Sequence, residues 1–289
     1  MGKIASRILF ALLMIAATAA LLLLDWRLTA LHHYFRGLLL AIVFALLAIL
    51  GFGELARLAG EGGVRILGIS GMLGVLAIAS LPYWRPALQR NISTVQFAPV
   101  LVVLLLTVAI VFAEQMIRFR TTDALRNVAA TVLGVVYLGC GAAMALWIRL
   151  HHGVATLVLF LAAVKLTDVA AYFIGTAIGR RKLIAWLSPG KTWAGLLGGL
   201  AVGTAASVLI VWAFRIPGFA LYKAAIFGLL VGAAGQFADL CESLLKRSVH
   251  VKDSGALVPE FGGVLDIIDS PLLAAPVAVV LLAILVVGA

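Results

Sequence analysis

Long apolar segments alternate with short polar ones along the chain. Runs of about 20 apolar residues can cross a bilayer core roughly 30 Å thick as helices. We therefore expect an all-α fold, a polytopic bundle of transmembrane helices. The pattern predicts about nine spans, over residues 8–24, 37–54, 64–81, 97–117, 128–148, 153–178, 193–214, 221–245 and 271–288.

The composition agrees with a membrane protein. The 289 residues are 64% hydrophobic and only 12% charged, whereas soluble domains have roughly 25% charged residues. The net charge of +10 is scattered through short loops, which argues against nucleic-acid binding. Cys140 and Cys241 fall inside predicted helices and indicate neither a disulfide framework nor a metal cluster.

The distribution of basic residues predicts an orientation. The first run follows Lys3 and Arg7 and is too long for a signal-peptide core, so we expect it to be retained. Most Lys and Arg residues lie in the N-terminal segment and the even-numbered loops, which places these in the cytoplasm. Loops 179–192 and 246–270 are then cytoplasmic. With only short loops and no organelle signal, we favour a bacterial inner membrane.

We divide the chain into N-terminal membrane helices, residues 1–150, and a catalytic part, residues 151–289, which carries both polar loops. Half of the 12 acidic residues lie within 239–269. Charge is costly beside a bilayer, so such a cluster in an apolar chain marks a candidate functional site.

The first candidate motif ends the eighth apolar run. Positions i, i+3, i+4 and i+7 form one polar stripe on a helix, here Asp239, Glu242, Ser243 and Lys246. Lys246 and the adjacent Arg247 also fit a solvated helix end. Asp239 fits that alternative poorly, because it lies deeper among apolar residues.

Further along, Lys252-Asp253 and Gly262-Gly263 precede two more aspartates. The glycines permit a tight turn and close backbone approach to a ligand. Asp266 and Asp269 share a face if a helix begins here, where they could also serve as helix caps. Together with Asp239 they favour Mg²⁺, a hard ion bound through carboxylates and phosphate oxygens. The neighbouring Lys and Arg residues suit the phosphates.

The second candidate motif lies upstream. Asp168 stands inside a predicted span one turn after Lys165, and an intramembrane ion pair is the structural alternative to a functional role. The segment Ser188-Pro-Gly-Lys191-Thr192 is similar to the end of a phosphate-binding loop, but it lacks that motif's preceding glycine and strand. As a loop before a Gly-rich helix, it could hold phosphate through Lys191 and backbone N–H groups.

Together these motifs resemble the phosphatidate cytidylyltransferase family, also called CDP-diacylglycerol synthases. The resemblance covers about residues 165–270. It rests on Ser243, Lys246-Arg247, Lys252-Asp253, Gly262-Gly263, Asp266 and Asp269, and upstream on Asp168, Ser188, Lys191, Thr192 and Trp193. Three positions depart from the family pattern, because Phe261 replaces a His, Ile267 replaces an Arg and Ala194 replaces a Glu.

The resemblance implies transfer of a cytidylyl group from CTP to phosphatidate in the membrane lipid, giving CDP-diacylglycerol and pyrophosphate. It also implies a homodimer and Mg²⁺ held by Asp239 and Asp266, with a second, monovalent cation such as K⁺. The implied catalytic residues are Asp239, Asp266, Lys246, Arg247, Lys252 and Asp253. The implied substrate-binding residues are Asp168, Ser188, Lys191, Thr192, Glu242, Ser243, Gly262, Gly263 and Asp269.

Two other functions fit parts of the pattern. A CTP-dependent polyprenol or isoprenoid kinase would have to activate a neutral hydroxyl, and the departures at Phe261 and Ile267 keep it open. An ion-coupled transporter would use Asp168, Asp239 and Lys165 as a relay. The lack of a convincing internal repeat and the concentration of charge in loops argue against transport.

Overall fold

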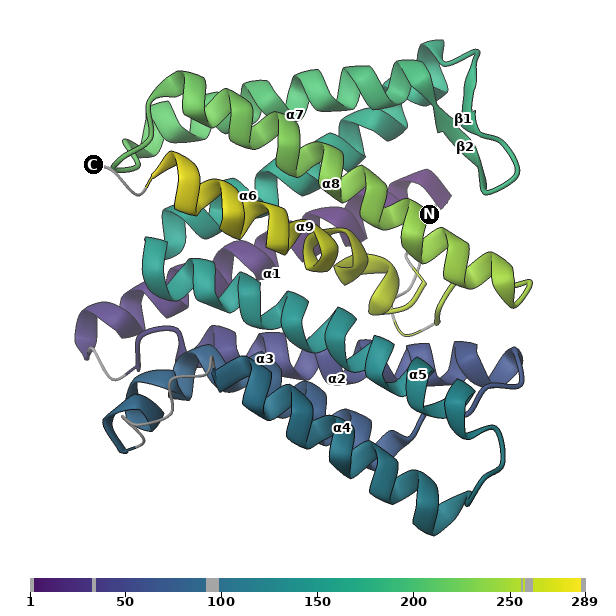
Figure 1. The fold of residues 1–289 in the computed structure, drawn as a ribbon. Helices are drawn as coiled ribbons and strands as arrows, with labels where there is room; N and C mark the ends of the chain where they lie inside the picture. Colours follow the sequence, from purple (N-terminus) through teal and green to yellow (C-terminus); the bar gives the residue numbers. More distant parts are fainter. Residues whose placement is uncertain (1–2, 33–34, 92–98, 256, 258–261, 287–289) are drawn as a thin grey trace. The chain divides into compact units, whose positions relative to one another are not determined.

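The computed structural model of the chain is built mainly of long helices (Figure 1). It describes residues 3–32, 35–91, 99–255, 257 and 262–286. Within these residues, seven helical segments are long and apolar enough to cross a membrane, and a shorter apolar helix covers Gly68–Trp84. The expected all-α membrane architecture is confirmed at this level. The count of nine spans and the cytoplasmic N-terminus remain predictions.

The elements follow one another in a simple order. They are α1 (Lys3–Leu31), α2 (Leu38–Glu61), α3 (Gly68–Asn91), α4 (Pro99–Arg118), α5 (Ala124–Gly134), the π-helix η2 (Val135–Cys140), α6 (Gly141–Ile178), β1 (Lys182–Ile184), β2 (Ser188–Thr192), α7 (Trp193–Phe214), α8 (Leu221–Ser248) and α9 (Leu265–Leu285). The predicted spans 128–148 and 153–178 both lie in the stretch from α5 to α6. Gly153, at φ 86° and ψ 176°, interrupts α6 where the second of them begins.

The chain forms two compact units. The first contains residues 1–150 and 253–268, and the second contains residues 151–252 and 269–289. The segment that carries Gly262, Gly263 and Asp266 therefore belongs with the N-terminal helices. The assignment of catalysis to residues 151–289 as a whole stays a prediction.

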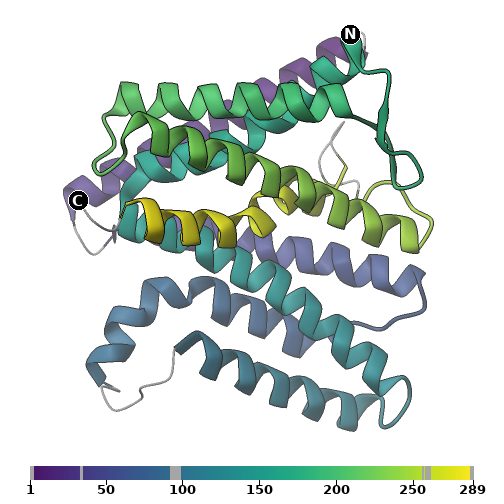
Figure 2. The same cartoon turned by 45° about the horizontal axis from the view of Figure 1, so that its top comes forward.

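In the first unit, α2 packs on α3, and α3 packs on α4 (Figure 2). Helix α3 also packs on η2. Phe52 of α2 is fully buried, and Gly71 and Gly134 face its ring so closely that a Cβ atom on either would overlap it. Small residues thus allow the helices to pack around one large side chain. A second buried contact joins α1 to α6, where Arg149 Nε lies 2.6 Å from Asp25 Oδ2.

In the second unit, α7 and α8 run side by side (Figure 1). Their contact has a seam of small residues, because a Cβ atom on Gly228 would overlap Ser207, and one on Gly203 or Gly232 would overlap Thr167 of α6. Such small-residue seams let membrane helices approach closely. The close approach of α6, α7 and α8 brings the polar ends of these helices together.

The segment 179–192, expected to be a loop, contains a short antiparallel hairpin of β1 and β2. Lys182 pairs with Thr192 and Ile184 with Ser188. The motif from Ser188 to Thr192 is therefore a strand that leads directly into α7. Its backbone geometry differs from that of a phosphate-binding loop.

Candidate active site

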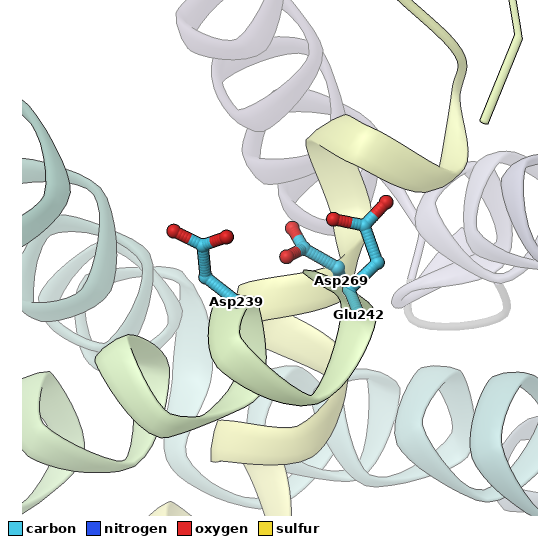
Figure 3. Close-up of side chains that lie close together, drawn as sticks. All are labelled: Asp239, Glu242 and Asp269. Atoms are coloured by element: carbon cyan, nitrogen blue, oxygen red, sulfur yellow. The ribbon is translucent and has the colours of Figure 1, made fainter. Parts of the chain in front are cut away.

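Three carboxylates gather in the second unit (Figure 3). Asp239 and Glu242 lie one turn apart on α8, and Asp269 comes from α9. One oxygen of each lies within 4.8 Å of the others. Glu242 and Asp269 are each 2% exposed, whereas the Asp239 side chain is 35% exposed. Carboxylates held this close repel one another unless cations are present, and their oxygens are the ligands that hard divalent ions prefer.

Three lysines lie beside these carboxylates. Lys246 Nζ is 2.7 Å from Glu242 Oε2, one turn along α8. Lys191 Nζ of β2 is 2.7 Å from Asp239 Oδ2. Lys165 of α6 interacts electrostatically with Asp269 and with Asp168. Each acidic group of the cluster therefore has a lysine near it, so the site holds cations suited to phosphate beside carboxylates suited to a metal.

A cavity of about 290 Å³ adjoins the cluster. Its polar lining comes from α6, the hairpin and α8, and it includes Asp168, Thr176, Ser188, Lys191, Thr192, Gln236 and Asp239. Gln236 links these elements, because its side-chain amide donates to Asp168 Oδ1 at 2.6 Å and its main-chain oxygen accepts from Lys191 Nζ at 3.1 Å. The two candidate motifs therefore meet in one pocket.

Thr192 has a local structural role in this pocket. It is the N-cap of α7, and its hydroxyl accepts the Gly195 N–H at 3.1 Å. Gly175 and Gly179 of the α6 end approach the same hydroxyl so closely that a Cβ atom on either would overlap it. These glycines explain how α6 and the start of α7 can pack together around a buried threonine.

Asp266 lies in the first unit, where its carboxylate binds Ser254 and Gly263. Its Oδ2 accepts the Gly263 N–H at 2.7 Å, the Ser254 hydroxyl at 2.9 Å and the Ser254 N–H at 3.0 Å. Gly262 has φ 94°, and a Cβ atom there would overlap the same carboxylate oxygen. We expected the backbone around Gly262-Gly263 to lie close to a ligand. In the structure it lies close to carboxylates of this chain.

The predicted site residues fall into two groups in the structure, and these groups differ in part from those that we predicted. Asp239 clusters with Glu242 and Asp269, whereas Asp266 belongs to the other unit. The Asp239–Asp266 metal pair therefore remains a prediction. Ser243 is half-buried on α8, and Arg247, Lys252 and Asp253 are exposed. Phe261 lies outside the described residues.

Several site residues were missed by the sequence analysis. Gln236 carries no charge and sits in an apolar run, so only its contacts with Lys191 and Asp168 reveal it. Ser270 Oγ donates a hydrogen bond to Asp269 Oδ1 at 3.2 Å. Outside this cluster, in the first unit, Glu54 at the end of the predicted span 37–54 had a visible signal, because an ionisable residue in an apolar run is rare without a function.

Known proteins share this sequence pattern. The model of the cytidylyltransferase family matches residues 5–285. A phosphatidate cytidylyltransferase of Brucella suis is 42% identical over 123 residues, 43% of this chain and 45% of that protein. One of Bacillus subtilis is 31% identical over 264 residues, 86% of this chain and 95% of that protein. The uncharacterized protein YnbB of Escherichia coli is 46% identical over 127 residues, 44% of this chain and 42% of that protein. The Brucella and Escherichia matches thus span less than half of those relatives.

Proposed function

We propose that this chain, which belongs to the cytidylyltransferase family, transfers the cytidylyl group of CTP to phosphatidate, giving CDP-diacylglycerol and pyrophosphate. The observation that carries the proposal is the contact between Lys191 and Asp239, which joins the strand β2 to the acidic cluster. The names of the Brucella and Bacillus relatives support the choice of substrates.

The reaction needs little proton chemistry. An oxygen of the phosphatidate phosphate, already anionic, attacks the α-phosphorus of CTP, and the bond from that phosphorus to the β-phosphate oxygen breaks to release pyrophosphate. The protein must therefore align the two phosphates and offset their negative charge. A pocket lined by Lys191, Asp168 and Asp239 suits this task better than one built around a general base.

The acidic cluster fits a divalent metal. Asp239, Glu242 and Asp269 would hold Mg²⁺, which when bound neutralises the triphosphate and the leaving pyrophosphate. Two lysines, Lys191 and Lys246, would then exchange their carboxylate partners for phosphate oxygens. Asp168 would keep Gln236 in place at the wall of the pocket.

We further propose that Asp266 is an additional metal ligand and that a second cation such as K⁺ binds. Arg247 and Lys252 would contact phosphates. The proposal also includes a homodimer in a bacterial inner membrane, with the active site facing the cytoplasm and phosphatidate arriving from the surrounding lipid. The Lys and Arg residues of the loops 179–192 and 246–270 support this orientation.

The test is pyrophosphate release from CTP in detergent, with and without phosphatidate and with and without Mg²⁺. The parent protein should release pyrophosphate only when both are present. Asp239→Asn and Asp266→Ala should abolish release, while the exposed-site control Asp123→Asn should match the parent. Pyrophosphate release that does not depend on phosphatidate or on Mg²⁺ would refute the proposal. If the parent protein is inactive, the substitutions at Phe261 and Ile267 and other acceptors would be tested next.

A further inference from the structure

Glu54 is a buried acid of the first unit with three hydrogen bonds to a distant segment. Its side chain lies on α2, and the residue is 7% exposed. Oε1 accepts the Val264 N–H at 2.9 Å, while Oε2 accepts the Leu265 N–H at 2.8 Å and the Ser254 hydroxyl at 3.1 Å. A carboxylate at this position takes up N–H groups that the start of α9 leaves without helical partners.

A second side chain on the same face of α2 holds the other end of this segment. Arg57, one turn after Glu54, donates from Nη2 to the main-chain oxygen of Ser254 at 2.5 Å. Two charged residues of α2, Glu54 and Arg57, thus contact Ser254 and the start of α9. Burying a carboxylate is costly without such partners, so the hydrogen bonds account for an acid at this depth.

The backbone of the turn lies directly against the Glu54 carboxylate. A Cβ atom on Gly255 or on Gly263 would come within 3.0 Å of a Glu54 oxygen, closer than real Cβ contacts. A side chain at either glycine would therefore displace the Glu54 carboxylate. We expected the Gly262-Gly263 pair to approach a ligand. In the structure Gly263 of this pair lies against the Glu54 carboxylate.

The same turn holds Asp266. Ser254 and Gly263, which lie against Glu54, both donate hydrogen bonds to Asp266 Oδ2. A shift of either residue would move the Asp266 carboxylate. Glu54 is thus connected to Asp266 through two residues that touch both acids, and its position limits where Asp266 can point.

We propose that Glu54 is a positioning residue that holds Ser254 and residues 263–265 against α2 and thereby sets the orientation of Asp266 for the transfer reaction. The link to the reaction rests on the proposed function, whereas the anchor itself rests on the hydrogen bonds alone. A purely structural role would lower thermal stability and leave the Mg²⁺ dependence of activity unchanged. A positioning role would change both the local opening of the turn and the Mg²⁺ dependence.

The test compares the full chain with Glu54→Gln and with the matched control Glu61→Gln, which changes an exposed acid at the end of the same helix. Glutamine keeps the size of the side chain, but its NH₂ group cannot accept, so at least one of the Val264 and Leu265 N–H groups loses its acceptor. Size-exclusion chromatography and circular dichroism would confirm that each variant folds.

Two measurements are made on each protein in detergent. Hydrogen exchange of the peptide that contains Val264 and Leu265 should be about tenfold faster or more in Glu54→Gln, as expected for loss of a hydrogen bond to a charged group, and unchanged in Glu61→Gln. The Mg²⁺ concentration for half-maximal pyrophosphate release should rise by about tenfold in Glu54→Gln alone.

The two measurements distinguish the role of Glu54 from the proposed function of the protein. Unchanged exchange in Glu54→Gln overturns the anchor, whatever the activity. Faster exchange with unchanged turnover and Mg²⁺ dependence overturns the positioning role. An inactive parent refutes the proposed function and the positioning role that depends on it, but the exchange measurement still decides whether Glu54 holds the turn.

Discussion

Lys191 Nζ of β2 lies 2.7 Å from Asp239 Oδ2 of α8, and the same ammonium donates to the main-chain oxygen of Gln236 at 3.1 Å. The Lys191 side chain is only 16% exposed. Its charge is therefore held at the wall of the pocket by groups from α8. In the proposed function, a bound nucleotide would compete with Asp239 for this ammonium.

Replacing Lys191 should weaken nucleotide binding. Lys191→Met keeps most of the side-chain length and removes the charge, and we expect a 10- to 100-fold loss of kcat/KM for CTP, about the value of a charge-assisted hydrogen bond. Steady-state pyrophosphate release measures this. Lys182→Met, at an exposed lysine of the paired strand β1, is the control. Equal activity in the two variants would show that Lys191 does not contact the nucleotide.

Removing one carboxylate of the cluster should weaken metal binding. Glu242→Gln and Asp269→Asn each take away one negative ligand, and we expect the Mg²⁺ concentration for half-maximal activity to rise about tenfold. Titration of activity with Mg²⁺ tests this, with Asp123→Asn as the control. If Asp266→Asn shifts the titration and these two variants do not, the metal belongs to the Asp239–Asp266 pair that the sequence analysis favoured.

An added methyl group at Gly255 should disturb the packing around Glu54. In Gly255→Ala, the Cβ atom would meet both the Glu54 carboxylate and the Cα atom of Gly263 within 3.0 Å. We expect a loss of about 1–3 kcal/mol in unfolding free energy, the usual cost of overpacking. Thermal unfolding in detergent measures it. Gly60→Ala, on α2 with open space around it, should be neutral or slightly stabilising, and similar behaviour of the two would contradict the packing argument.

The buried ion pair of Asp25 and Arg149 should matter for stability and not for chemistry. Their side chains are 0% and 3% exposed, and Arg149 Nη2 also donates to Thr29 Oγ1 at 2.9 Å. Arg149→Met leaves the Asp25 carboxylate buried without its cation, so we expect a loss of about 3–5 kcal/mol.

The double variant Asp25→Leu/Arg149→Met should recover most of that loss, because it removes both buried charges. Arg126→Met serves as the control, since the Arg126–Asp123 pair is largely exposed and should contribute less than about 1 kcal/mol. Thermal unfolding of all three variants tests this pair. If Arg149→Met is as stable as the parent protein, burying the Asp25 carboxylate without its cation does not lower the unfolding free energy.

The sequence by itself determined the features that depend on neighbouring residues. Apolar run length predicted α7 as 193–214, which are its observed bounds, because helix formation and membrane burial follow local hydropathy. The stripe on α8 was also predictable, and Glu242 and Lys246 do pair at i and i+4, since helix geometry alone brings such positions together. The family resemblance likewise rested on local motifs.

Only the tertiary structure decided which acids meet. Asp266 and Asp269 are one turn apart, yet Asp266 binds Ser254 and Gly263 while Asp269 joins Glu242 and Asp239. Hydropathy shows that a segment is a helix, but it does not show which helix packs against it or which side chains then face each other. Glu54 is the clearest case, because its partners Ser254, Val264 and Leu265 are remote in sequence. Close packing of the chain against α2 makes those contacts, and no local pattern specifies them.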